Sequence, residues 1–162
     1  MLHSVYLSLG SNLGDSAAQL LEAIEQLGQL GTVVSVSSFY ETEPVEFTAQ
    51  PWFLNCAVRL DTSLAAEALM ADILEIEQRL GRRRDEQKGP RTVDIDILLY
   101  GKAKIARPGL TIPHPAMPQR RFVLEPLAEI APKLWHPVLE RTVEELRDQL
   151  PRGQAVRKKL IP

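Results

Sequence analysis

Residues 5–40 read VYLSLGSNLGDSAAQLLEAIEQLGQLGTVVSVSSFY, and this stretch decides the expected fold. It begins with an apolar, β-prone run at Val5–Leu9, which ends at the turn residues Gly10-Ser11-Asn12. Apolar residues then recur three or four positions apart over Leu13–Leu27, a spacing that predicts one face of an amphipathic helix. The β-branched, serine-rich segment Thr32–Tyr40 predicts a second strand.

The same order of elements repeats further along the chain. Phe53–Leu60 predicts a strand, a helical stripe runs over Leu69–Leu80, and Val93–Tyr100 predicts a final strand. The order strand-helix-strand, twice, is the βαββαβ arrangement of an α+β, ferredoxin-like fold. We therefore expect one antiparallel four-stranded sheet with both helices packed on one face, inside a single domain spanning residues 1–162.

The last third of the chain has a different character. Of the 12 prolines, seven fall between Pro108 and Pro137, which predicts loops and short helices in a Pro-rich C-terminal extension. Thr142-Val143-Glu144-Glu145 has the pattern of a capping box that opens one more helix.

Composition excludes several classes of protein. The 19 basic and 21 acidic residues give a net charge of −2, which argues against a protein that coats nucleic acid or a membrane surface. One cysteine excludes a disulfide framework and a cysteine-rich zinc site. The longest uncharged stretch, Gln26–Tyr40, is too short and too polar to span a bilayer, and no signal peptide is evident. We expect a cytoplasmic monomer.

The segment with the most chemistry is the strand that contains Asp94 and Asp96. Alternation places these two carboxylates on one face, with Leu98 and Tyr100, while the other face carries Val93, Ile95, Ile97 and Leu99 into the core. Carboxylates about 7 Å apart repel unless water or a cation lies between them, and Mg²⁺ is the hard cation that such oxygens prefer. A solvated acidic strand face is the alternative interpretation.

A basic segment directly precedes this strand. Arg82–Arg91 contains five basic and two acidic residues, a net charge of +3. Cations that stabilise the end of the preceding helix would explain it without a ligand. Beside two carboxylates, the same residues could instead form a loop that closes over phosphates.

Two other segments carry candidate ligand contacts. Phe53 and Asn55 share one strand face, a combination suited to a planar heteroaromatic ligand, although a core aromatic beside a hydrogen-bonded amide would look the same. His114 lies between two prolines that restrict its backbone, and Arg120 or Arg121 could reach a phosphate. The phosphate-binding loop of kinases, the nucleophile elbow and the His-Glu-x-x-His motif do not occur in the sequence.

These segments together resemble the 6-hydroxymethyl-7,8-dihydropterin pyrophosphokinase family of folate biosynthesis. The resemblance covers about Tyr6 to Pro132 and rests on motifs in fixed order: LGSNLG at 9–14, SFYET at 38–42, FLN at 53–55, GPRT at 89–92, DIDIL at 94–98 and IPHP at 112–115. It implies transfer of the terminal diphosphate of ATP to the pterin hydroxymethyl group, giving AMP, with ATP as co-substrate and two Mg²⁺ ions.

The resemblance also implies roles for individual residues. Asp94 and Asp96 resemble the metal ligands, and Arg82 and Arg91 resemble catalytic loop cations that engage phosphates. Residues that resemble the pterin pocket are Thr42, Val45, Phe53, Asn55 and Phe122. Residues that resemble the ATP site are Glu77, Arg84, Ile97, Thr111, His114 and Arg120.

Some features depart from the family pattern, and two other functions stay open. The basic segment lacks the Trp that many members carry before Gly89-Pro90, and Glu43 stands where some relatives have Pro. Gly10-Ser11 with Asp94-x-Asp96 also resembles a nucleotidyltransferase, but there the two motifs lie much closer than the 83 residues that separate them here. A ferredoxin-like regulatory module that binds a small ligand is the non-enzymatic alternative.

Overall fold

The computed structural model describes residues 1–12, 15–43, 52–81, 93–151, 153 and 155–159. Its central strand is β1 (His3–Ser11), which pairs antiparallel with β4 (Phe53–Thr62) on one side and β5 (Asp94–Tyr100) on the other. With β3 (Phe39–Thr42) and β10 (Val156–Lys159), the strands follow the order β10-β3-β4-β1-β5, and β2 (Thr32–Val36) also pairs with β4. The predicted antiparallel sheet is therefore present, and β5 is one of its edges.

The sheet has six strands rather than the expected four. The segment predicted as one strand at Thr32–Tyr40 is divided into β2 (Thr32–Val36) and β3 (Phe39–Thr42), which pair with different parts of β4. The break lies at Ser37, whose hydroxyl accepts a hydrogen bond from the Ala57 amide at 2.8 Å and donates one to the Ser38 carbonyl at 2.7 Å. A further strand, β10 (Val156–Lys159), pairs with β3.

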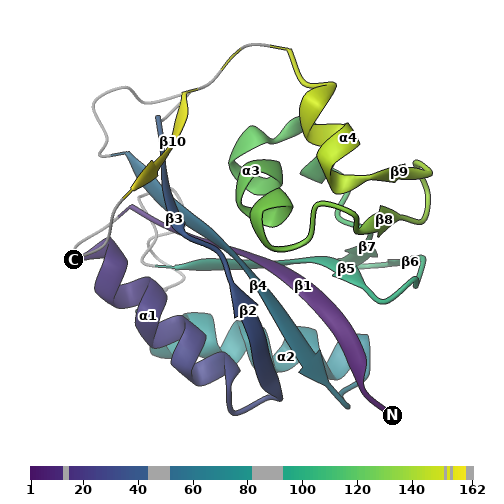
Figure 1. The fold of residues 1–162 in the computed structure, drawn as a ribbon. Helices are drawn as coiled ribbons and strands as arrows, with labels where there is room; N and C mark the ends of the chain where they lie inside the picture. Colours follow the sequence, from purple (N-terminus) through teal and green to yellow (C-terminus); the bar gives the residue numbers. More distant parts are fainter. Residues whose placement is uncertain (13–14, 44–51, 82–92, 152, 154, 160–162) are drawn as a thin grey trace.

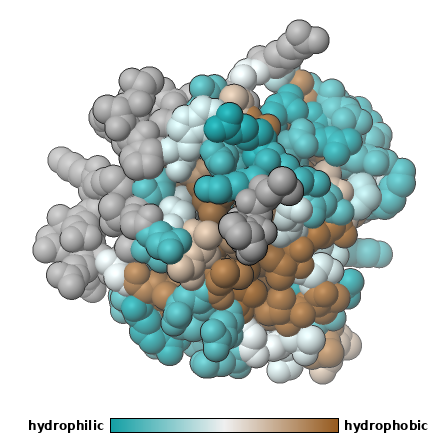
Figure 2. All heavy atoms as spheres, turned by 60° about the vertical axis from the view of Figure 1, so that its left-hand side comes forward, coloured by the Kyte–Doolittle hydropathy of each residue, from teal (hydrophilic) through white to brown (hydrophobic). Residues whose placement is uncertain are grey.

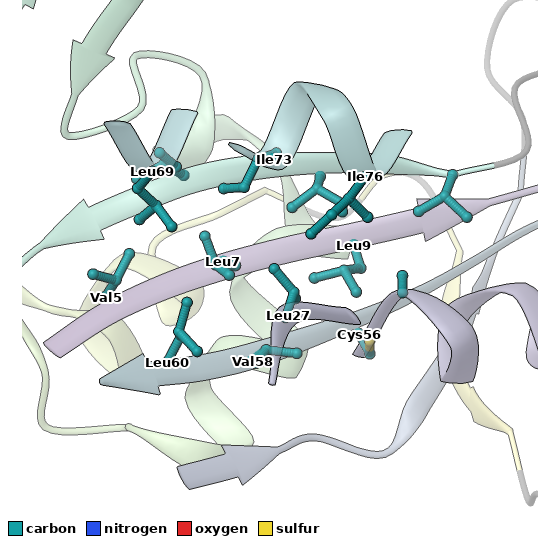
Figure 3. Close-up of a cluster of buried hydrophobic side chains, with 14 of the residues drawn as sticks. Val5, Leu7, Leu9, Leu27, Cys56, Val58, Leu60, Leu69, Ile73 and Ile76 are labelled. Atoms are coloured by element: carbon teal, nitrogen blue, oxygen red, sulfur yellow. The ribbon is translucent and has the colours of Figure 1, made fainter. Parts of the chain in front are cut away.

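Helices α1 (Ser16–Leu27) and α2 (Ala66–Arg79) cover one face of the sheet. The alternate residues Val5, Leu7 and Leu9 of β1 point into a core shared with both helices (Figure 3). Figure 3 also shows Ile73 and Ile76 of α2 turned toward this strand. The helix periodicity read from the sequence thus identified the correct faces.

Helices α3 (Arg121–Ile130) and α4 (Val143–Asp148) lie on the opposite face of the sheet (Figure 1). The second core contains Tyr6 and Ala57, which alternate with the first core's residues along β1 and β4. Thr142 and Glu145 form the predicted capping box at the start of α4. Although proline was expected to break regular elements, α3 includes Pro126.

Several short elements complete the fold. They are β6 (Ile105–Arg107) paired with β7 (Leu110–Ile112), the 3-10 helix η2 (Met117–Gln119), and β8 (Trp135–His136) paired with β9 (Arg141–Thr142).

Figure 2 shows hydrophobic side chains gathered in a band on one face of the molecule. Large apolar residues of α1 and β2 that reach the surface are Leu21, Val34 and Val36.

One prediction for β5 was wrong. The pairing with β1 shifts register between Tyr6 and Leu7, because a bulge inserts an extra residue in β5. Leu99, expected in the core with Ile97, instead joins Leu98 in the core under α3, and Tyr100 turns to the α1/α2 side. The alternation of side chains between the two faces of β5 therefore follows the prediction only up to the bulge.

Candidate active site

A cavity of about 580 Å³ opens where β1, β3, β4 and β5 meet the segment that leads into α3. We call it the central cavity. Its lining residues are Ser8, Gly10, Thr42, Phe53, Asn55, Asp94, Asp96, Gln119, Arg120 and Phe122. Seven of these were candidates from the sequence, and they come from four separate segments of the chain.

The two carboxylates lie on the cavity face of β5, as alternation predicted. Asp94 is opposite Gly10 and Asp96 is opposite Ser8 in the register with β1. These neighbours are small, so the strand that faces the carboxylates leaves space in the cavity. Both carboxylates are partly exposed, whereas Ile95 and Ile97 between and after them are buried.

Two long-range hydrogen bonds fix β5 on its outer side. A carboxylate oxygen of Glu77, on α2, accepts a hydrogen bond from the Ile95 amide at 2.8 Å. The Leu98 carbonyl accepts one from the His114 amide at 3.0 Å. An edge strand has unpaired main-chain groups, and these contacts satisfy two of them while holding the acidic segment in place.

Asn55 of β4 lies opposite Gly10 of β1, and a neighbouring strand holds its side chain. The Thr42 hydroxyl donates a hydrogen bond to Asn55 Oδ1 at 2.9 Å, and both side chains are buried. Asn55 Nδ2 faces Gly10 so closely that a Cβ built there would lie 2.7 Å from it. Glycine at position 10 is therefore needed for this placement of the amide.

Aromatic and cationic groups complete the central cavity. Phe53 and Phe122 both line it, and the Arg120 guanidinium lies 5.5 Å from the centre of the Phe122 ring. Arg121, which the sequence left as an equal candidate, turns away. Its guanidinium donates hydrogen bonds to Glu125 and to the main-chain carbonyls of Leu150 and Pro151.

A smaller cavity of about 290 Å³ adjoins the central one and shares Asp96 with it. We call it the hairpin cavity, because the β6–β7 hairpin forms one wall. Its lining residues are Met70, Asp96, Ile97, Gly109, Leu110, Thr111, His114 and Pro115. Three candidates for the ATP site, Ile97, Thr111 and His114, meet here.

The imidazole of His114 is held in one neutral form. Its Nδ1 accepts a hydrogen bond from the Ala116 amide at 3.1 Å, which places the proton of the neutral ring on Nε2. Burial lowers the pKa of His114, against the opposing charge of Asp96, and the nearby Arg120 lowers it further. At neutral pH the ring is therefore uncharged and offers an N–H donor.

Glu77 differs in position from the other candidates. Its side chain is 3% exposed, and it lines neither cavity. The candidates Val45, Arg82, Arg84 and Arg91 lie outside the described residues. Sequence reasoning did not identify Ser8, Gly10 or Gln119 as lining residues; Gly10 was assigned to a turn, although it lies within β1.

Among the described residues, no group of three or more His, Cys, Asp or Glu side chains is arranged to hold a metal ion. The only acidic pair that lines the central cavity in that part of the chain is Asp94 and Asp96. Mg²⁺ is commonly bound by one or two carboxylates, with water and substrate phosphates as its other ligands. The donor set therefore fits a magnesium ion that arrives with a phosphorylated substrate.

Solved structures share this fold. A crystal structure of Plasmodium falciparum HPPK-DHPS A437G with STZ-DHP matches 92% of this chain and 45% of that chain, with a TM-score of 0.73 and 17% identity. Another, of the wild-type protein with pterin and p-hydroxybenzoate, matches 92% of this chain and 42% of that chain, with a TM-score of 0.74 and 18% identity. This chain thus corresponds to less than half of those proteins.

Relatives with higher identity point to one activity. A 2-amino-4-hydroxy-6-hydroxymethyldihydropteridine pyrophosphokinase of Methylorubrum extorquens is 48% identical over 80% of this chain and 83% of its own length. A protein of the same name from Bacillus subtilis is 47% identical over 80% of this chain and 79% of its own. The folic acid synthesis protein fol1 of Pneumocystis carinii is 44% identical, over 83% of this chain and 18% of its own.

The two adjoining cavities, which share the carboxylate of Asp96, fit an enzyme that transfers a phosphorylated group between two small molecules. The family model for 7,8-dihydro-6-hydroxymethylpterin-pyrophosphokinase matches residues 6–132, and the chain belongs to this family. It is an ATP-dependent pyrophosphokinase of folate biosynthesis, which transfers a diphosphate to hydroxymethyldihydropterin.

Proposed function

We propose that the central cavity binds the pterin and that the hairpin cavity binds the nucleotide. One observation carries this proposal: a single cavity brings two carboxylates together with two aromatic rings and an oriented amide. Aromatic faces suit a flat heterocycle, and an amide offers the donor and acceptor that a pterin edge needs. Asp96 lines both cavities, so the diphosphate would pass from one substrate to the other beside it.

The proposed pterin contacts are Thr42, Phe53, Asn55 and Phe122. Because Thr42 donates to Asn55 Oδ1, the amide has one orientation, and its Nδ2 is directed toward the Gly10 side of the cavity. A fixed amide lowers the entropy that binding must overcome. Val45 is proposed to contribute from outside the described residues.

The proposed nucleotide contacts are Ile97, Thr111, His114 and Arg120. Ile97 and Leu110 supply apolar surface for a base, while the neutral His114 supplies an N–H donor. Arg120 lines the central cavity, near the substrate's reacting end, and brings a permanent positive charge. The cations Arg82, Arg84 and Arg91 are proposed to engage phosphates, with Arg82 and Arg91 in catalytic roles. Glu77 supports this side through β5.

We further propose that Asp94 and Asp96 hold Mg²⁺, with two ions in the complete site. When bound, Mg²⁺ neutralises charge on the phosphate oxygens and makes the phosphorus easier to attack. The chain's own contribution is alignment, because the pterin hydroxyl and the β-phosphorus must meet in line. The rings and Asn55 orient the pterin, and the arginines stabilise the negative charge that develops.

The remaining expectations concern the protein as a whole. The order β3-β4-β1-β5, with α1 and α2 on one face, supports a ferredoxin-like description of the core. We propose a cytoplasmic monomer whose partners are ATP and 6-hydroxymethyl-7,8-dihydropterin, without nucleic acid or membrane. In the described part of the chain, no helix has the length and apolar character of a membrane span.

Substitution of Asp96 tests the proposed site. Asp96→Ala should abolish formation of AMP from ATP in the presence of Mg²⁺ and the pterin, because it removes an acidic side chain shared by the two cavities. Asp148→Ala is the matched control, since Asp148 is exposed on α4 and pairs with Arg147. Product analysis should detect AMP with the control and none with Asp96→Ala, while both variants keep the same circular dichroism. Magnesium-dependent turnover by Asp96→Ala would refute the assignment.

A further inference from the structure

Strand β10 lies beyond the residues that the family model matches, yet it joins the sheet next to the proposed pterin site. The family match ends at residue 132, whereas β10 spans Val156–Lys159. Val156 is opposite Thr42 in the antiparallel pairing with β3, and Lys159 is opposite Phe39. The C-terminal strand is therefore in contact with the strand that carries a cavity residue.

The side chain of Arg157 connects two segments that lead into the cavity. Its guanidinium lies 3.2 Å from a carboxylate oxygen of Glu41 and 4.5 Å from the centre of the Trp52 ring. Glu41 directly precedes Thr42, and Trp52 directly precedes Phe53. Thr42 and Phe53 are themselves opposite each other in the β3–β4 pairing, and both line the cavity.

Main-chain contacts extend the same connection. The Ala155 amide donates to Glu43 Oε1 at 2.8 Å, and the Glu43 amide donates to the Ala155 carbonyl at 3.2 Å. Lys158, the next cation along the strand, contacts a different element. Lys158 faces Glu129 of α3, 3.7 Å away, rather than Trp52. Arg157 is thus the side chain of β10 that contacts both flanks of the cavity's pterin side.

Planarity makes arginine suited to this position. A guanidinium can stack on an indole face and still donate hydrogen bonds to a carboxylate at its edge. Trp52 is 37% exposed, and the Arg157 guanidinium lies over its ring. The main chain at Trp52 continues directly into β4 at Phe53, which lines the cavity.

We propose that Arg157 is a positioning residue for the pterin side of the cavity, acting through the Trp52 ring while Glu41 holds its guanidinium in place. The proposal rests on the assignment of Thr42, Phe53 and Asn55 to the pterin. It predicts an effect on pterin binding and not on the nucleotide, because every contact of Arg157 described above lies on the β3 and β4 side.

Steady-state kinetics of the full-length enzyme test this proposal. Arg157→Ala should raise KM for the pterin about two- to fivefold, the loss expected for one exposed cation–π contact, with kcat and KM for ATP unchanged. Arg157→Lys keeps the charge beside Glu41 but loses the planar stack, so it should give a smaller increase. Arg107→Ala is the matched control, because Arg107 is similarly exposed and is also paired with a glutamate, Glu67.

A double-mutant cycle separates positioning from a general structural effect. If Arg157 acts through the ring, Trp52→Ala and the double variant should show about the same increase in pterin KM as each other. Effects that multiply, or a pterin KM unchanged by Arg157→Ala, would overturn the proposal. Asn55→Ala tests the assignment of the pterin site separately from the role of Arg157. If it raises pterin KM while Arg157→Ala does not, only the role of Arg157 fails. If neither does, the pterin assignment fails as well.

Discussion

Glu77 could bind ATP directly or have a structural role, and the two roles predict different effects of its removal. The family resemblance places it on the ATP side, yet its side chain is 3% exposed and accepts a hydrogen bond from the Ile95 amide at 2.8 Å. That amide lies between the two carboxylates of β5. We therefore predict that removing Glu77 destabilises the protein and misplaces Asp94 and Asp96, rather than weakening ATP binding directly.

The size of the effect follows from the kind of contact that is lost. A buried hydrogen bond to a charged group contributes about 1.5–3 kcal/mol, and the Ile95 amide would be left buried without this acceptor. For a chain of this length, each kcal/mol corresponds to about 2–4 °C in melting temperature. Glu77→Ala should therefore lower the melting temperature by about 3–12 °C. Glu77→Gln keeps a carbonyl acceptor and should lose less.

Calorimetry and steady-state kinetics together decide between the two roles. Glu75→Ala provides the control, since Glu75 is exposed on the same helix. We expect Glu77→Ala to reduce both the melting temperature and kcat, with KM for ATP changed much less. A normal melting temperature combined with a large increase in KM for ATP would show that Glu77 binds the nucleotide, and the structural argument would then be refuted.

Two further predictions concern the central cavity and the stability of the protein at low pH. Gly10→Ala should raise KM for the pterin about tenfold by displacing Asn55, because Asn55 Nδ2 would lie 2.7 Å from the new Cβ. Gly153→Ala, which has open space around it, is the control and should leave this KM unchanged. Equal KM values for the two variants would show that Gly10 is not needed to place Asn55. Burial opposes ionisation of Glu129, but its hydrogen bond from Tyr40 and neighbouring donors outweigh this and lower its pKa. The contribution of Glu129 to the free energy of unfolding should therefore be complete above about pH 4.5 and be lost as the pH falls further. Urea titrations should accordingly give wild type and Glu129→Gln the same free energy of unfolding in acid. A constant difference between these free energies at all pH values would argue against this role of Glu129.

The helices and central strands could be predicted because their apolar periodicity is local. Leu69, Ile73 and Ile76 follow helical spacing and are all fully buried, and the apolar run predicted as a strand at Val5–Leu9 lies within β1. Strand β10 could not be found in this way. Its residues VRKK have no apolar alternation, and the strand is defined by its pairing with β3, beside which its cations meet Glu41 and Glu129.

The members of the cavity were predicted better than their arrangement. Asp94, Asp96 and Asn55 were identified by residue type and alternation, which are visible in one strand at a time. Residue type alone left Arg120 and Arg121 equivalent, although the family resemblance favours Arg120. The direction of α3 separates them by turning Arg121 toward Glu125 and the Leu150 carbonyl. The bulge in β5 likewise depends on pairing with β1, which no local pattern reports.

The edge position of β5 explains how one strand can serve two cavities. A central strand uses the main-chain groups on both of its sides to pair with neighbouring strands, whereas β5 pairs with β1 alone among the strands that the structure describes. Its free side is therefore available to the segment after β7, where the His114 amide bonds to the Leu98 carbonyl. This contact brings Thr111 and His114 beside Ile97, while β1 and β4 bring Gly10 and Asn55 to the other side. Asp96 lines both cavities because the acidic strand is the last strand of the sheet.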